Sequence, residues 1–220
     1  MIHWPVAFFP VEEELDTSVR GYKTEKIDDS RDGNNIDPNV SIHETWEAME
    51  ALVDKGLVRH IGVSNFPISL LHELMSKSRI HPSVNQVELH PFLQQPKLLR
   101  YCKNRGIHVQ AYSPLGTPGF KQEGEPSILE NPILNDIAVR YNITVAQVCL
   151  SWALQRGTSV VAKSESRDHQ RENLLIFGGE KDDFLEFTEE EIQIITDIDQ
   201  DYRYFRPEEW WGSIGMAVFH

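Results

Sequence analysis

Cysteine is scarce in this sequence, with Cys102 and Cys149 the two among 220 residues. Two cysteines form at most one disulfide, which is too few for the disulfide-rich scaffolds of small secreted proteins. We therefore expect two inert thiols on helices and a cytoplasmic location. Long apolar segments are also missing, and none approaches the about 18 residues that span a bilayer. The first ten residues hold no basic segment followed by an apolar one, so we expect neither a signal peptide nor a membrane anchor.

Basic residues are few relative to acidic ones, 21 against 34, which leaves a formal net charge of −13. Nucleic acids and anionic membrane surfaces repel such a protein, so we expect neither as a partner. Hydrophobic residues make up 40% of the chain, an ordinary share for a globular protein with a buried core. We predict a single domain over residues 1–220 that acts on a small molecule.

Short apolar, β-branched segments alternate with segments of helical periodicity along most of the chain. This alternation predicts βα units, and hence an α/β protein with a parallel sheet. Residues 12–42 read as a long acidic loop, and residues 202–220 as an irregular aromatic tail. Strands are expected at 1–6, 57–64, 83–89, 107–113 and 158–164, and helices at 44–56, 67–78, 95–106, 131–142, 144–157, 167–176 and 188–199.

A dinucleotide-binding doubly wound sheet is disfavoured, because the sequence has no G-x-G-x-x-G segment after a strand. A (β/α)₈ barrel predicts instead that polar residues with chemical roles lie at the carboxyl ends of several strands. The expected strands carry such residues at or near their ends, namely His3, Ser64, Asn65, Gln86, Glu88, Tyr112, Ser113, Lys163 and Ser164. We therefore predict a barrel of which five strands are recognisable.

Five segments that contain these residues resemble the aldo-keto reductase family in wording, order and spacing: IHWP, GLVRHIGVSNF, VNQVELHP, AYSPLG and AKSESRDHQREN. The resemblance covers essentially the whole chain and is closest to sugar and polyol reductases such as xylose reductases. It implies a (β/α)₈ TIM barrel that is incomplete here, running from the end of strand 4 through strand 8, with the C-terminal helix and tail. It also implies an oxidoreductase that reduces an aldehyde or ketone, in this subgroup a sugar, by hydride transfer from NAD(P)H.

The resemblance gives each strand-end residue a role. His3 matches the histidine that orients the substrate carbonyl, where a neutral donor stabilises the negative charge that develops on oxygen. The cofactor-binding positions are Ser64, Asn65 and Gln86 at the nicotinamide carboxamide, Tyr112 stacked on the nicotinamide ring, Ser113, Leu115 and Thr117 in the loop over the pyrophosphate, and Lys163, Ser164, His169, Glu172 and Asn173 at the adenosine end. The substrate pocket is expected to include Trp4, Phe8, Phe205, Trp210 and Trp211.

Cofactor preference depends on the adenosine end. Family members that prefer NADP usually carry an arginine six residues after the lysine that matches Lys163. Here His169 takes that place and Glu165 adds a negative charge, and an imidazole does not replace the guanidinium fork that grips a 2′-phosphate. We predict NADPH with relaxed discrimination, and NADH as the alternative. No metal is expected, because DDSRDGN has calcium-loop spacing but Asn39 stands where that loop needs glutamate.

The chain also departs from the family's pattern. The family's proton donor is a tyrosine assisted by a lysine and an aspartate, and all three precede the histidine that matches His3. Hydride transfer without a general acid loses a factor of roughly 10²–10⁴ in rate, so we expect this chain to lack turnover by itself. The hypotheses are a reductase recorded without its N-terminal strands, a non-catalytic cofactor-binding or protein-interaction half-barrel, and half-barrels that pair. Family members are usually monomers or dimers.

Several of these residues have plain structural alternatives. For Ser64 and Asn65 the alternative is to cap the helix expected at Pro67. For His3 and Tyr112 it is core packing, and for Glu88 it is pairing with a neighbour inside the site. The alternative is weakest for Lys163, because a lysine at a strand end is costly to bury without an anionic partner.

Overall fold

The computed structural model describes residues 1–9, 36–119, 121–176, 185–210 and 218–219. The chain divides into two compact units, one formed by Met1–Pro82 with Arg206–His220 and the other by Ser83–Phe205. Most of the acidic loop, including the DDSRDGN segment, lies outside the described residues, as does Trp211. The two units are described one after the other.

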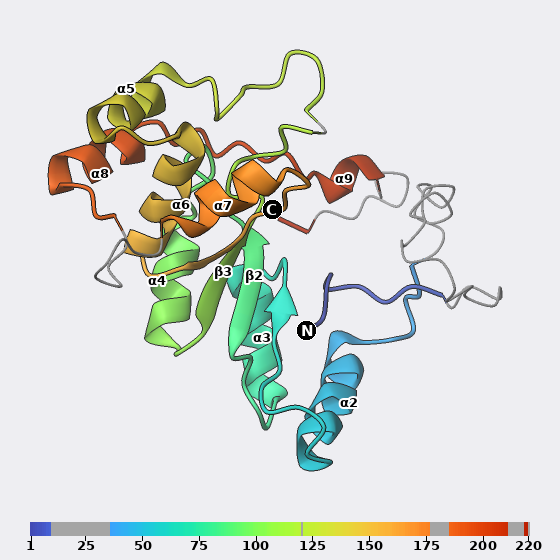
Figure 1. The fold of residues 1–220 in the computed structure, drawn as a ribbon. Coiled ribbons are helices and arrows are strands. Elements are labelled where there is room, and N and C mark those ends of the chain that lie inside the picture. Colours follow the sequence, from blue (N-terminus) through green and yellow to red (C-terminus); the bar gives the residue numbers. More distant parts are fainter. Residues whose placement is uncertain (10–35, 120, 177–184, 211–217, 220) are drawn as a thin grey trace. The chain divides into compact units, whose positions relative to one another are not determined.

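The second unit holds a parallel sheet with the order β2 (Val84–Glu88), β3 (His108–Tyr112) and β4 (Ser159–Val161). In Figure 1, β2 and β3 lie side by side. Each strand falls inside the range expected from the sequence, so the α/β class with parallel strands is confirmed. The pairing is in register at both contacts, with Gln86 opposite Gln110 and Gln110 opposite Ser159.

The two faces of this sheet differ in chemistry, because side chains alternate along each strand. One face carries Asn85, Val87, Val109 and Ala111, all buried. The opposite face carries a group of mostly polar side chains from the same strands, and these are Gln86, Glu88, Gln110, Tyr112 and Ser159. This second set, called the polar face below, contains two of the predicted cofactor-binding residues.

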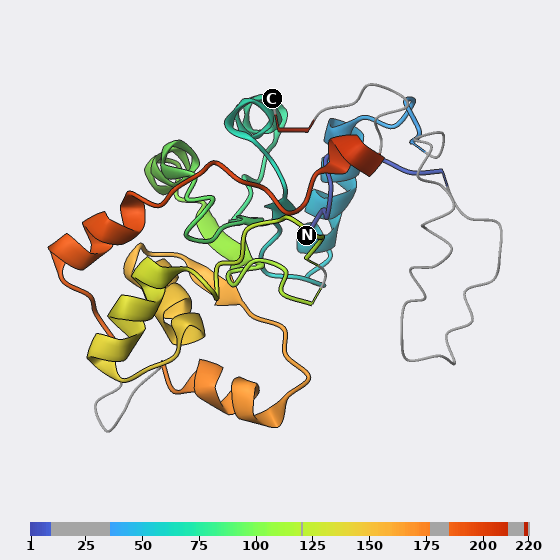
Figure 2. The same cartoon turned by 90° about the horizontal axis from the view of Figure 1, so that it is seen from above.

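The helices of the second unit follow their strands, as βα units require. They are α4 (Pro96–Asn104), α5 (Pro132–Tyr141), α6 (Val145–Gln155), α7 (Arg167–Leu174) and α8 (Glu189–Thr196). Helix α5 packs against α6 and α8, and α7 packs against α6, as Figure 2 shows. Because α6 is apolar over most of its length, it lies buried and centres the core around Trp152.

Local sequence fixes the turn between α5 and α6. Asn142 takes a left-handed conformation (φ 55°) at the end of α5, which asparagine tolerates better than most residues. Thr144 then caps α6 through the Gln147 backbone N–H, and the Gln147 side chain accepts the Thr144 N–H in return. This capping box satisfies two backbone donors that would otherwise have no partner.

The first unit contains α2 (Ile42–Asp54), β1 (Val63–Ser64), α3 (Ile68–Lys77) and α9 (Pro207–Trp210). Trp46 is buried on α2, and its indole N–H donates to the Ile80 carbonyl at 2.9 Å. Glu50, one turn further along α2, is also buried and accepts the backbone N–H groups of Arg79 and Ile80 at 2.8 Å each. Glu50 on α2 therefore holds the segment that follows α3.

Four sequence expectations for the first unit need correction. The strand expected at 57–64 is reduced to Val63–Ser64, and the one at 1–6 to a single parallel bridge from Ile2 to Val63. Helix α3 begins at Ile68 with Pro67 as its N-cap and no side-chain cap, so capping by Ser64 and Asn65 is wrong. Both lie before the cap residue, Ser64 within β1. The tail contains the short helix α9, where an irregular segment was expected.

No single helix within the described ranges is long and apolar enough to cross a membrane. Helices α5 and α6 pass a test of length and composition only when taken together, across a bend of 89°.

Candidate functional site

A row of hydrogen-bonded polar side chains crosses the polar face of the sheet. The Gln86 amide donates to Gln110 Oε1, and the Gln110 amide donates to Ser159 Oγ at 3.3 Å. The His108 ring lies 2.9 Å from the same hydroxyl. These bonds fix the orientation of the Gln86 amide, which is half-buried near the end of β2. An amide held in this way presents its donor and acceptor in a defined geometry.

Tyr112 ends β3 directly opposite Glu88 and is half-buried. Its ring forms a T-shaped pair with the Phe205 ring, at a centroid distance of 5.4 Å and an interplanar angle of 82°. Burial raises the pKa of the Tyr112 phenol well above its usual range, and the Glu88 charge adds to this rise. The phenol is therefore a poor proton donor at neutral pH. Its ring, not its hydroxyl, is suited to a role in binding.

The loop after β3 turns sharply at Ser113, which has φ 48°, and the Gly116 N–H closes the turn on the Ser113 carbonyl at 2.9 Å. Gly116 has φ +72°, and a Cβ there would lie 3.0 Å from the Tyr204 ring. Glycine is required here for both reasons. Leu115 and Thr117 are half-buried in this loop.

Lys163 is not buried, which corrects the expectation based on the cost of burying a lysine. Its side chain is 73% exposed, and its ammonium group donates to Glu165 Oε1 at 2.6 Å. The hydrogen bond from Lys163 holds the pKa of the Glu165 carboxyl below its usual value. Glu165 therefore stays ionised at neutral pH. Its carboxylate pairs with the Lys163 ammonium group, which the resemblance assigns to a phosphate of the cofactor.

The other adenosine-end residues lie on or next to α7. Ser166 caps this helix by accepting the His169 backbone N–H, and Ser164 Oγ accepts the Ser166 N–H at 3.2 Å. His169 is exposed on the first turn. Glu172 and Asn173 are half-buried in the last turns. The predicted adenosine-end positions thus lie on α7 or in the segment directly before it.

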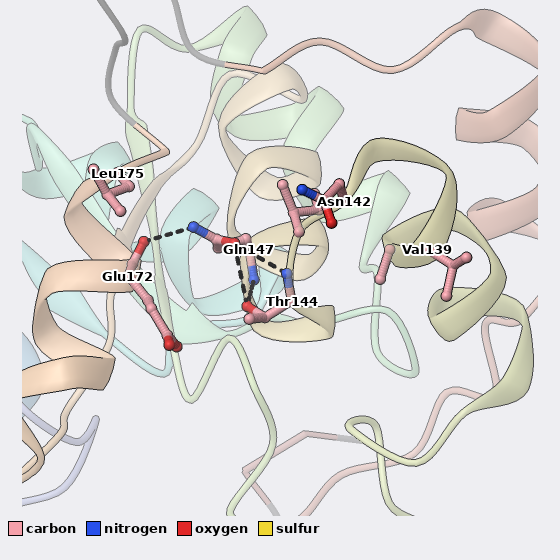
Figure 3. Close-up of a pocket in the computed structure, with 8 residues that line it drawn as sticks. Val139, Asn142, Thr144, Gln147, Glu172 and Leu175 are labelled. Atoms are coloured by element: carbon pink, nitrogen blue, oxygen red, sulfur yellow. Dashed lines mark hydrogen bonds between the residues drawn. The ribbon is translucent and has the colours of Figure 1, made fainter.

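A hollow of about 710 Å³ lies where α5, α6 and α7 meet (Figure 3). It is lined by Ala138, Val139, Asn142, Ile143, Thr144, Gln147, Glu172 and Leu175. In Figure 3 the Gln147 amide reaches across to the Glu172 carbonyl, a hydrogen bond of 2.9 Å that ties α6 to α7. Glu172 is the one predicted site residue in this lining, so the hollow does not coincide with the expected cofactor site.

The predicted residues of the first unit form a separate group. His3 is exposed, and its ring packs on Trp4 at a centroid distance of 5.8 Å. The Asn65 amide donates to the His3 carbonyl at 3.0 Å and to Ser64 Oγ at 3.3 Å. Asn65 itself has φ 63° and is buried. The structure therefore brings His3 next to Ser64 and Asn65, and core packing as the role of the His3 ring is wrong.

The remaining pocket residues are only partly described. Phe8 is 47% exposed, Trp210 ends α9, and Trp211 lies outside the described residues. Sequence reasoning did not find the partners of Glu88, which is fully buried and accepts backbone N–H groups from Tyr204 and Phe205. A carboxylate at a strand end was a visible signal, but its partners lie 116 and 117 positions further along the chain.

Residues 10–200 match the sequence model of the aldo/keto reductase family. The chain belongs to this family. It is 39% identical over 181 residues to the NADP-dependent D-sorbitol-6-phosphate dehydrogenase of Malus domestica, covering 80% of this chain and 56% of the relative. It is 35% identical over 215 residues to the NAD(P)H-dependent D-xylose reductase of Kluyveromyces lactis, covering 95% of this chain and 63% of the relative. The chain thus spans between about half and two thirds of the length of these relatives.

Solved aldo-keto reductase structures have the same fold. One, crystallised with NADPH, superposes with a TM-score of 0.76 at 30% identity, over 94% of this chain and 56% of its own. The aldo-keto reductase of the silkworm, Bombyx mori, superposes with a TM-score of 0.75 at 30% identity, over 94% of this chain and 55% of its own. The expected fold, a partial barrel of the aldo-keto reductase type, is confirmed by these matches.

Proposed function

We propose that this chain forms the cofactor-binding part of an aldo-keto reductase that uses NADP(H) to reduce the carbonyl group of a sugar or related small aldehyde. The observation that carries the proposal is the polar face, where the fixed Gln86 amide and the Tyr112 ring stand on neighbouring strands. A planar amide beside an aromatic ring suits a nicotinamide, which has a carboxamide to hydrogen-bond and a ring to stack.

The other residues have supporting roles in this proposal. The resemblance assigns Ser64 and Asn65 to the carboxamide, and the loop from Ser113 to Thr117 to the pyrophosphate. Residues on and before α7 hold the adenosine end, with Lys163 as the cation. His3 orients the substrate carbonyl, and the raised pKa of Tyr112 argues against its phenol as the acid that completes the reaction.

Titration of the 220-residue chain with NADPH and NADH, followed by nicotinamide fluorescence, tests the proposal. We expect saturable binding of NADPH that Tyr112→Leu weakens about three- to tenfold, because an aromatic contact is lost. Tyr101→Leu is the matched control, since Tyr101 is half-buried on α4 and packs under Arg105. Failure of the unmodified chain to bind either dinucleotide would contradict the proposal, and equal affinity for both would contradict the NADP preference.

An assay of aldehyde-dependent NADPH oxidation then distinguishes a complete enzyme from a module that only binds the cofactor. Oxidation that His3→Ala abolishes is the result expected of a complete enzyme. Saturable binding without oxidation is the result expected of a cofactor-binding module.

A further inference from the structure

Glu88 ends β2 with a carboxylate that is fully buried. Its Oε1 accepts the Tyr204 backbone N–H at 2.8 Å, and its Oε2 accepts the Phe205 N–H at 3.2 Å. The next residue but one, His90, places Nε2 at 3.0 Å from Oε1. A buried charge is tolerated only when it is hydrogen-bonded, and here both oxygens bond to a segment distant in sequence. Glu88 therefore fastens residues 204–205 to the end of the strand.

The His90 ring contacts the same carboxylate from a second side chain. It is fully buried, and its Nδ1 has no hydrogen-bond partner among the described residues. A neutral ring with its proton on Nε2 donates to Glu88 and leaves Nδ1 as a bare acceptor. The Tyr204 ring packs on the same imidazole in a T-shaped pair, with 5.1 Å between the ring centroids.

The fastened segment contacts two parts of the proposed cofactor site. Phe205 forms a T-shaped pair with the Tyr112 ring. Tyr204 lies so close to Gly116, in the loop after β3, that a Cβ there would collide with it, and its hydroxyl donates to the Pro126 carbonyl at 2.9 Å. Glu88 also stands opposite Tyr112 in the sheet. Its carboxylate therefore sets the distance between the ends of β2 and β3 and residues 204–205.

We propose that Glu88 is a positioning residue that, by holding the backbone of Tyr204 and Phe205, fixes the Tyr112 ring in the orientation in which it stacks on the nicotinamide. This inference rests on the proposed function, since the partner of Tyr112 is the nicotinamide of that proposal. Glu88 itself touches no ligand in this scheme. Its effect passes through Phe205 to the nicotinamide half of the cofactor and leaves the adenosine half unaffected.

The Glu88→Gln variant tests this, because an amide keeps the shape of the side chain but has a single acceptor oxygen for two N–H donors. Amide hydrogen exchange is measured first. We expect the Tyr204 and Phe205 amides to exchange about tenfold faster or more in the variant, since each has lost a charge-assisted bond. Unchanged exchange at both amides would overturn the proposal, whatever the chain binds.

Dissociation constants for NADPH and for adenosine 2′,5′-bisphosphate, which has no nicotinamide, provide the second readout. We expect Glu88→Gln to weaken NADPH binding about three- to tenfold and to leave the bisphosphate unchanged, as expected for loss of an aromatic contact. Equal weakening of both, or of neither, would overturn the positioning role. If the unmodified chain binds neither NADPH nor the bisphosphate, the proposed function fails, and Glu88 then has no role in nicotinamide binding. The exchange data still decide whether Glu88 holds the backbone of Tyr204 and Phe205.

Two further variants keep the test decisive. Glu191→Gln changes another buried glutamate, one that caps α8 and bonds to Thr188, Tyr141 and Arg140. It should alter stability without separating NADPH from the bisphosphate. Phe205→Leu keeps the backbone bonds to Glu88 but removes the ring contact. It should reproduce the selective loss of NADPH affinity even if Glu88→Gln does not fold.

Discussion

Lys163 is expected to bind a phosphate of the cofactor, but in the structure its ammonium group is paired with the Glu165 carboxylate. Both side chains are largely exposed, at 73% and 85%, and they form a hydrogen-bonded ion pair at 2.6 Å. A phosphate that binds Lys163 must therefore compete with a neighbouring carboxylate and is also repelled by it. At the residue scale, this competition is the clearest reason for weak affinity at the adenosine end.

We predict that Glu165→Gln tightens the binding of adenosine 2′,5′-bisphosphate about two- to fivefold, the range expected for an exposed ion pair. Isothermal titration calorimetry at fixed ionic strength measures the change, which should shrink at high salt. Asp54→Asn is the matched control, because it removes one negative charge from another surface ion pair, with Arg79 at 2.7 Å. Equal tightening in both variants would point to net charge alone.

The two thiols are also defined at the residue scale. Burial raises the pKa of Cys149 to about 12 and that of Cys102 to about 11, the latter despite a hydrogen bond with Asn85. Since the thiolate is the reactive form, we predict that both react with an aromatic disulfide reagent at pH 8 at least about a hundredfold more slowly in the folded chain than in denaturant. Rapid reaction of either thiol in the folded chain would contradict the burial that the structure shows.

At the scale of elements, the starts of the helices expected at 144 and 188 were predicted to within one residue, because such starts depend on neighbours in sequence. The Thr144–Gln147 and Thr188–Glu191 capping boxes both follow the pattern of threonine and a long polar residue three positions later. Strand ends were less predictable. The segment 57–64 has the composition of a strand but forms only Val63–Ser64, since pairing depends on partners that composition does not reveal.

We predict that Thr144→Ala lowers the free energy of unfolding by about 1 kcal/mol, the usual cost of losing an N-cap side chain. Urea denaturation measures it as a lower midpoint with an unchanged slope. Thr196→Ala serves as the control, because the Thr196 hydroxyl donates to the Ile192 carbonyl within α8 and caps nothing. That change should stay within about 0.5 kcal/mol.

Helix α8 should give a pH-dependent contribution to stability through Glu191. Burial by itself raises the pKa of this carboxyl, but the hydrogen bond from Tyr141, that from the Thr188 N–H and the Arg140 charge outweigh it, so the pKa is lowered. The stabilisation is thus complete above the unfolded pKa of about 4.3 and is lost as the pH falls through the lower folded value. We predict that Glu191→Gln destabilises at pH 7 and that the difference from wild type disappears toward pH 3, as measured by urea denaturation. A constant difference would show that Glu191 acts through packing.

At the scale of the molecule, the family and fold class could be predicted from the sequence. The contacts between the strand ends and residues 204–205 could not. Gln86 and Tyr112 were found because β2 and β3 form where the apolar, β-branched segments predict strands. Their roles in the cofactor site remain a prediction. The bonds from Glu88 to Tyr204 and Phe205 were missed because no local pattern joins a strand end to a tail segment. The exposure of Lys163 was missed because its partner, Glu165, was read only as a nearby charge.

The net charge of −13 should limit stability at low ionic strength through self-repulsion. We predict that raising sodium chloride from about 20 mM to about 300 mM, which shortens the Debye length from about 20 Å to about 6 Å, raises the melting temperature by about 2–5 °C at pH 7.5. Differential scanning calorimetry measures the shift. The same salt series near the isoelectric point, about pH 5.1, should give little change, and an equal rise there would exclude self-repulsion as the cause.

The bond between Glu88 and Tyr204 spans 116 positions of the chain, and this has a consequence for biosynthesis. At about 5–20 residues per second, the ribosome adds the partner roughly 6–23 s after it has added the glutamate. Throughout that interval the Glu88 carboxylate lacks its backbone N–H partners from Tyr204 and Phe205. Water must therefore solvate it, and the end of β2 stays hydrated in the nascent chain. The nicotinamide end of the proposed site is therefore completed late in translation, long after the capped helices α5 and α6 have been synthesised.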